Sequence, residues 1–120
     1  MDQFATLIGT LMQSRNQAHI YHLQTESFAA HAALNTYYDE IVELFDGLVE
    51  SYQGRYGILR NYKMAGAIKE DDNPIVYFEA LTKFVETIRA KCPQDSYIQN
   101  QIDTVVELLE STKYKLKYLH

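Results

Sequence analysis

The sequence predicts an all-α protein, a four-helix bundle with a longer connector between its second and third helices. Apolar residues recur three and four positions apart over four long segments, which is the spacing of one helix face. The 120 residues contain only two prolines and five glycines. A β-sandwich or barrel needs a turn signal about every 8–12 residues, so these counts exclude it. A chain of this length suits a single domain.

The first two helices are expected at residues 2–23 and 27–53. The second is the longer, and Ser27 is a candidate for its N-terminal cap. Its apolar stripe continues until Gly54 and Gly57, which are expected to stop it. The short link between the two segments predicts an antiparallel helix pair.

The connector that follows contains Gly57, Gly66 and the acidic run 70–72, which argue against a continuous helix. It leaves room for a short helical turn at 59–64. The four-helix order therefore includes one long crossover.

The last two helices are expected at residues 74–91 and 95–118. Asn73 is the expected N-cap of the third, because Pro74 then falls at the first helical position. Asp95 or Ser96 is expected to cap the fourth.

Composition removes several classes of function. A net charge of −5 argues against nucleic-acid binding, because phosphate contacts require a surplus of Lys and Arg. No apolar run approaches the roughly 18 residues of a membrane span, and no phosphate-binding loop or nucleophile motif occurs. Cys92 is the single cysteine. We expect a cytoplasmic protein, in the host cytoplasm if a phage encodes it.

Three of the four histidines fall within thirteen residues: His19, His22 and His31. His19 and His22 are three apart and share a helix face, and His31 occupies the apolar stripe of the second helix. One core histidine is usually a hydrogen-bonded structural residue. Three at one corner of a bundle are equally consistent with a metal or proton-handling site.

The second helix also carries a polar edge. At about 100° per residue, Asn35, Asp39, Asp46 and Glu50 lie within about 40° to 100° of His31. Asp46 and Glu50 are four apart, so both carboxylates can reach one cation. The alternative interpretation is a solvated helix face.

His31 and Asp46 are separated by about 22 Å along a helix with a rise of 1.5 Å per residue, so they cannot bind one metal within one chain. A second copy solves this if the second helices pack antiparallel about a two-fold axis near Tyr38 and Asp39. We therefore expect a homo-oligomer containing at least this dimer. Nitrogen and oxygen ligands together suit iron, and also zinc or manganese.

Residues 18–57, AHIYHLQTESFAAHAALNTYYDEIVELFDGLVESYQGRYG, resemble the ferritin-like superfamily, and within it the Dps family of DNA-binding proteins from starved cells. They are still more similar to short, uncharacterised ferritin-like proteins of tailed bacteriophages. The family pattern has one histidine on the first helix and another early in the second. A carboxylate follows four residues later, and an Asp and a Glu come fifteen and nineteen residues after the second histidine.

His31, Asp46 and Glu50 match that pattern at the same offsets. The first histidine has two candidates: His19 keeps the twelve-residue spacing, whereas His22 better matches the local context before the helix break. The resemblance thus implies a metal-ligand set, with neighbouring residues that support it. The set is His22, His31, Asp46, Glu50 and His19, and the supporting residues are Asn35, Tyr38 and Asp39.

This resemblance implies an iron site shared between subunits, with two irons or one, that oxidises ferrous iron, so ferroxidase activity is an expectation. No catalytic residue is assigned apart from the ligands. Asn35 departs from the family because an amide replaces the early carboxylate. Asn35 favours the alternative, a phage-encoded structural or interaction module that kept the helical bundle and lost the metal chemistry. DNA binding does not follow, because the first basic residue is Arg15.

Overall fold

The structure, a computed structural model, describes residues 3–65 and 73–120. This part of the chain contains four α-helices and one 3-10 turn, and no strand. It confirms the all-α fold class and the four-helix bundle. The elements are α1 (Gln3–Gln24), α2 (Phe28–Tyr56), α3 (Pro74–Ile88), η1 (Arg89–Lys91) and α4 (Ser96–Tyr118).

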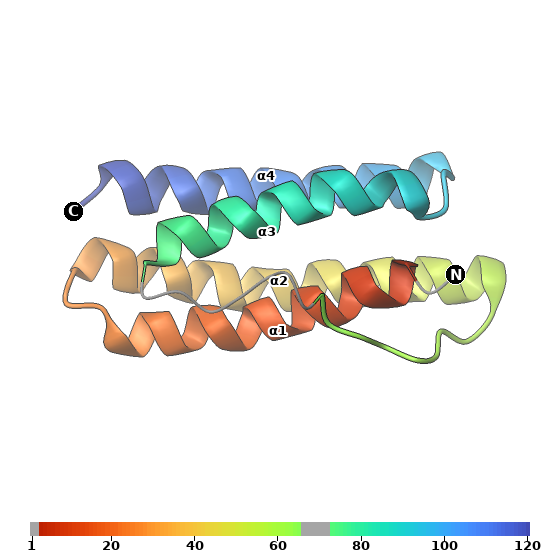
Figure 1. Ribbon diagram of the computed structural model, residues 1–120, viewed down its shortest axis with the longest axis horizontal. Coiled ribbons are helices and arrows are strands. Elements are labelled where there is room, and N and C mark those ends of the chain that lie inside the picture. Colours follow the sequence, from red (N-terminus) through yellow and green to blue (C-terminus); the bar gives the residue numbers. More distant parts are fainter. Residues whose placement is uncertain (1–2, 66–72) are drawn as a thin grey trace.

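The helices form two antiparallel pairs that pack on each other (Figure 1). One pair is α1 with α2, the other is α3 with α4, and α2 packs along α4. Helices α2 and α3 run in the same direction, so the chain returns along the bundle between them. Because α1 and α3 lie on one side, the seam between α2 and α4 faces the other.

Local caps account for several helix ends. The Ser27 hydroxyl accepts a hydrogen bond from the Ala30 amide at 3.2 Å, and the Asn73 side chain accepts one from the Ile75 amide at 2.9 Å. Helix α2 ends before Gly57, which has a φ of 97° that disfavours other residues. The Ser27 and Asn73 side chains thus hydrogen-bond backbone amides that the first turn of a helix leaves without a partner.

Two helix ends lie away from the expected positions, and one expected cap is in place without a side-chain bond. Gly54 stays inside α2, because a glycine in a helical conformation weakens a helix without ending it. Helix α3 ends at Ile88, and the last turn tightens into η1 before Pro93. Asp95 is the N-cap of α4, but its carboxylate makes no capping bond. It accepts the hydroxyl of Tyr56, which links α2 to α4.

The expected helical turn at 59–64 is wrong, because residues 57–65 contain no helix. Their backbone bonds to other elements instead of to itself. The Leu59 amide donates to Gln53 Oε1 at 3.0 Å, and the Ala65 amide donates to Thr10 Oγ1 at 2.8 Å. Gly66 and the acidic run 70–72 lie outside the described residues.

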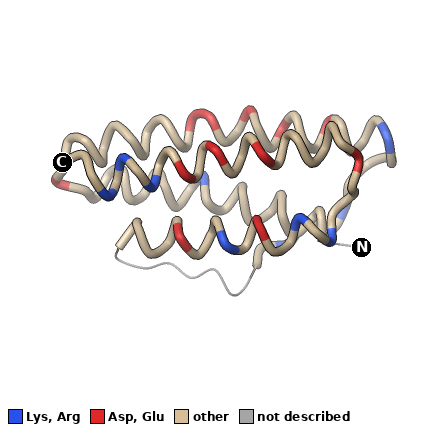
Figure 2. The backbone as a smooth tube through the Cα atoms, turned by 90° about the horizontal axis from the view of Figure 1, so that it is seen from above, with Lys and Arg blue, Asp and Glu red and all other residues tan. Residues whose placement is uncertain are grey.

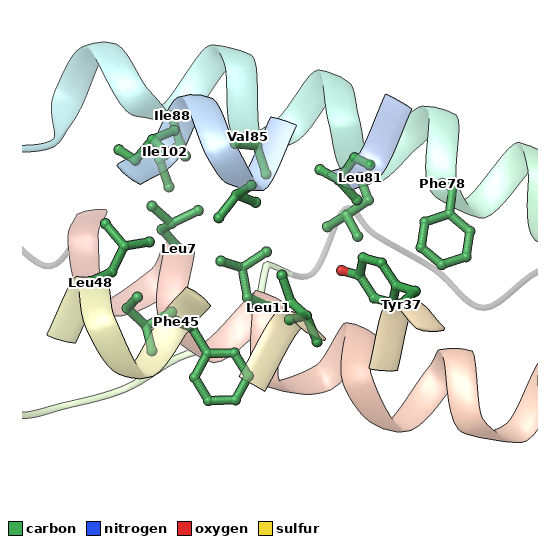
Figure 3. Close-up of a cluster of buried hydrophobic side chains, with 14 of the residues drawn as sticks. Leu7, Leu11, Tyr37, Phe45, Leu48, Phe78, Leu81, Val85, Ile88 and Ile102 are labelled. Atoms are coloured by element: carbon green, nitrogen blue, oxygen red, sulfur yellow. The ribbon is translucent and has the colours of Figure 1, made fainter. Parts of the chain in front are cut away.

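The core fills the space between the two helix pairs (Figure 3). Leu7 and Leu11 point from α1 toward aliphatic side chains of α3 and α4. Tyr37 and Phe78 meet edge to face, with ring centroids 4.9 Å apart. The labelled core residues, all buried, are Leu7, Leu11, Tyr37, Phe45, Leu48, Phe78, Leu81, Val85, Ile88 and Ile102.

Candidate metal centre

His22 and His31 face each other across the elbow between α1 and α2. The three-residue turn 25–27 folds the end of α1 back onto the start of α2. The two imidazole rings stack with centroids 3.6 Å apart and an interplanar angle of 20°. His22 is buried and His31 is half-buried. The short turn therefore brings together two of the histidines that the sequence singled out.

Each of these histidines hydrogen-bonds the backbone of the other. His22 Nδ1 lies 2.7 Å from the His31 carbonyl oxygen, and His31 Nδ1 lies 2.8 Å from the His22 carbonyl oxygen. A carbonyl oxygen only accepts, so both Nδ1 atoms carry the proton. In the neutral rings Nε2 then keeps its lone pair. This is the tautomer in which a histidine binds a metal through Nε2 while a backbone carbonyl orients its ring.

His19 has different partners. Its Nδ1 lies 3.2 Å from Nη1 of Arg15, and its ring stacks on Tyr38 with centroids 4.4 Å apart. An arginine only donates, so Nδ1 of His19 accepts and the proton of the neutral ring is on Nε2. Neither nitrogen of His19 then offers a lone pair to a metal. The four-residue spacing of Arg15 and His19 is the signal in the sequence for this contact.

Asn35 is held by hydrogen bonds at both ends of its amide. The Tyr38 hydroxyl donates to Asn35 Oδ1 at 2.7 Å, and Asn35 Nδ2 donates to Asp39 Oδ2 at 3.2 Å. The chain of three side chains runs along α2 beside the histidines. An aspartate at position 35 could not donate to Asp39, so the amide is what allows this arrangement.

Asp46 and Glu50 lie apart from the histidines. Helix α2 is continuous from Phe28 to Tyr56, so His31 and Asp46 remain about 22 Å apart along its axis. Within the described ranges, no group of three or more His, Cys, Asp or Glu residues could hold a metal ion. One chain thus brings together only part of the ligand set that the sequence led us to expect.

The exposed face of α2 carries a row of carboxylates at helical spacing: Asp39, Glu43, Asp46 and Glu50. No Lys or Arg lies on α2 before Arg55. In Figure 2 the acidic positions recur along α2 and α4, whereas the basic positions of these two helices lie toward their C-terminal ends. Glu43, which was not among the expected site residues, lies seven residues before Glu50 on the same face.

The interior of the bundle offers no carboxylate. Among the described residues no Asp or Glu is buried, and a buried 2.7 Å hydrogen bond joins Ser14 Oγ to the Tyr37 hydroxyl. Burial raises the pKa of Tyr37 far above its usual range, so this hydroxyl stays neutral. The buried part of the described helices therefore offers no carboxylate ligand for a metal.

The described helices include none that is both long and apolar enough to cross a lipid bilayer. Fold and side chains together define an all-α bundle with a histidine pair at its α1–α2 elbow and an acidic outer helix face.

Residues 22–116 match a family of unknown function (DUF5856), and the chain belongs to this family. The match begins at His22, so it includes His31 and the acidic face of α2. The chain is also similar to an uncharacterised 14.6 kDa protein of the mobD-ri intergenic region of Enterobacteria phage T4. The two are 27% identical over 109 residues, which cover 91% of this chain and 84% of the phage protein. No solved structure matches the chain.

Proposed function

We propose that this protein binds a transition-metal ion between two copies of the chain, in the manner of ferritin-like proteins of the Dps type. The observation that carries the proposal is the reciprocal hydrogen bonding of His22 and His31, which leaves Nε2 of both neutral rings as lone-pair donors. The up-down-down-up order of the helices, with one long crossover, also supports it. We place His19 beside the site and not among its ligands, because its Nδ1 accepts a hydrogen bond from Arg15.

Asp46 and Glu50 of a second copy would complete the ligand set. Both are exposed, and neither forms an ion pair within the described residues. Antiparallel packing of two α2 helices about an axis near Tyr38 brings residue 46 of one copy level with residue 31 of the other. Two imidazoles with two carboxylates suit iron, zinc or manganese. With ferrous iron bound, the site would support ferroxidase activity, in which dioxygen or peroxide accepts the electrons.

This dimer should depend on the metal. The outer face of each α2 presents Asp39, Glu43, Asp46 and Glu50 without a nearby cation on that helix. Opposing two such faces sets like charges against each other, and a bound cation reduces that repulsion. A chelator is therefore expected to separate the two copies.

The test is metal binding by protein purified without chelator. Calorimetric titration with Zn²⁺, and with Fe²⁺ under anaerobic conditions, is expected to show saturable binding that His31→Ala and Asp46→Ala abolish. Glu26→Gln is the matched control, because Glu26 is exposed near the elbow but belongs to neither group. Oxidation of Fe²⁺ followed by absorbance then tests the ferroxidase expectation. Absence of uptake at neutral pH overturns the proposal.

A second candidate is a structural or interaction module, encoded by a phage, that has kept the helical bundle without metal chemistry. The observation that favours it is Asn35, whose amide bonds to Tyr38 and Asp39 and adds no anionic ligand beside His31. The relative in phage T4 is compatible with such a role. Binding partners without metal uptake would support this candidate.

A further inference from the structure

The seam between α2 and α4 contains two shallow cavities in line. One, of about 240 Å³, is lined by residues that include Glu40, Leu44 and Glu107. The other, of about 260 Å³, is lined by residues that include Lys115 and Leu119. The α2 residues of the two cavities share one helix face, and so do those of α4. Together the cavities form one groove, which we call the α2–α4 groove.

The groove is open because neither α1 nor α3 covers this side of the bundle (Figure 1). Its floor is apolar: Leu44 and Leu108 are half-buried and pack against the core. Beyond Leu44 the seam closes, since Gln101 Nε2 donates to Ser51 Oγ at 2.9 Å across it. The open part therefore extends from the start of α2 to Leu44, about 22 Å at 1.5 Å per residue.

Charges of opposite sign occupy the two ends of the groove. Lys115 lies at one end, and Glu40 and Glu107 lie at the other. Among the described residues none of the three forms an ion pair. The neighbouring lysines differ, because Lys113 pairs with Glu110 and Lys117 with Glu79. The groove thus holds one cationic and one anionic end, each without an intramolecular partner.

We propose that a second copy of this chain docks on the α2–α4 groove, face to face, about a two-fold axis. The axis lies in the interface at right angles to the helices and passes close to Thr36 and Ser111. Because Lys115 and Glu107 are each four residues from Ser111, the two-fold rotation opposes Lys115 of one copy to Glu107 of the other, twice in the dimer. It also brings the exposed Leu119 to the level of Leu44 of the second copy. The occupant is a second copy because the groove is complementary in charge to itself.

This surface goes beyond the proposed metal site, and the two dimers are separable. The metal dimer would use the outer acidic face of α2 and would be lost in chelator. The dimer through the α2–α4 groove uses neither His31 nor Asp46, so it persists in chelator. The following measurements are therefore made in EDTA.

Sedimentation velocity over a range of protein concentrations measures the dissociation constant of the full chain. Lys115→Glu and Glu107→Lys are each expected to weaken the dimer by at least about tenfold, because each opposes like charges twice across the interface. The double variant restores the opposite signs and is expected to regain most of the affinity. Lys83→Glu is the control, because Lys83 is exposed on α3, away from the groove. Circular dichroism verifies that each variant is folded.

Two results overturn the proposal. The chain could remain monomeric at every concentration in EDTA, which leaves the groove without a second copy. Alternatively a dimer could form whose affinity neither single variant changes, which assigns it to another surface. Recovery in the double variant is the outcome that a general loss of stability cannot produce.

Discussion

The carbonyl oxygen of Lys63 occupies the space that the Cβ of any other residue at Gly9 would need. A Cβ built at Gly9 would lie 2.0 Å from that oxygen, far inside van der Waals contact. The Lys63 amide in turn faces the carbonyl oxygen of Ala5 at 3.5 Å. The segment 58–65 can therefore lie against α1 only because position 9 has no side chain.

Gly9→Ala is expected to lower the free energy of unfolding by about 1–3 kcal/mol, because two backbones must move apart and cannot yield as a flexible side chain would. Urea denaturation measures the loss. Trypsin should also cut faster after Arg60 and Lys63, since their segment is displaced. Gly54→Ala is the control: no atom lies within 4 Å of its Cβ, so helix propensity should raise stability by about 0.5–1 kcal/mol. Equal losses in both variants would contradict this account of Gly9.

Ser14→Ala is expected to lower the free energy of unfolding by about 1–3 kcal/mol, because it leaves the buried Tyr37 hydroxyl without its acceptor. The Ser14 hydroxyl donates to the Leu11 carbonyl at 2.7 Å, so the Tyr37 hydroxyl must be the donor to Ser14 Oγ. Removing Ser14 Oγ takes away this acceptor. Tyr37→Phe removes the donor itself, so the double variant should be more stable than Ser14→Ala. Additive losses in urea denaturation would show that the two hydroxyls do not stabilise each other, which would contradict this hydrogen bond.

His31→Ala is expected to leave the helical content unchanged and to lower the free energy of unfolding by only about 0.5–1.5 kcal/mol, the net worth of one hydrogen bond. His31 is half-buried, so little apolar packing is lost with its ring. His22→Ala should cost more, because His22 is 8% exposed. Far-ultraviolet circular dichroism and urea denaturation measure both effects. Collapse of the fold in His31→Ala would identify this histidine as a structural core residue.

The thiol of Cys92 is expected to react slowly with a disulfide reagent until the chain unfolds. Burial raises its pKa to about 11, against a small opposing effect of Arg89. A pKa of about 11 in place of the ordinary 9.0 lowers the thiolate fraction at pH 8 by about a hundredfold. The thiolate is the reactive form of the side chain. Reaction rates in buffer and in urea measure the protection. Similar rates in the two conditions would contradict it.

The same pKa shift predicts a pH dependence of stability. Folding favours the neutral thiol, so this contribution is complete below the ordinary pKa of 9.0 and is lost as the pH rises toward about 11. An unperturbed tyrosine ordinarily ionises near pH 10, so the wild type alone would not isolate the effect of the thiol. The relevant quantity is therefore the difference between the wild type and Cys92→Ser, which should shrink from pH 8 to pH 10.5.

Local patterns predicted most of the fold. The helices follow from apolar residues three and four apart, and Ser27 and Asn73 cap them through bonds to residues two or three positions away. Such features depend on near neighbours in the chain, so one sequence is enough to find them. The rule failed at 59–64, where the Leu59 amide bonds to the Gln53 side chain and the Lys63 amide bonds to the Ala5 carbonyl oxygen.

The sequence indicated which histidines lie near one another, but it did not indicate the contacts that their rings make. Spacing placed His19, His22 and His31 at one corner and separated His31 from Asp46. Spacing alone did not predict the hydrogen bond between Arg15 and Nδ1 of His19.

The sequence by itself determined four helices, their caps and the cluster of histidines at the elbow, because these depend on interactions within a few residues. Only the tertiary structure decided the exchange of hydrogen bonds between His22 and His31, the contact of Gly9 with Lys63 and the open groove along α2 and α4. Each of these depends on how helices and loop meet in space. The spacing of residues within one helix does not predict such contacts, because the partners are far apart in the sequence and meet only after the chain between them has closed into a loop.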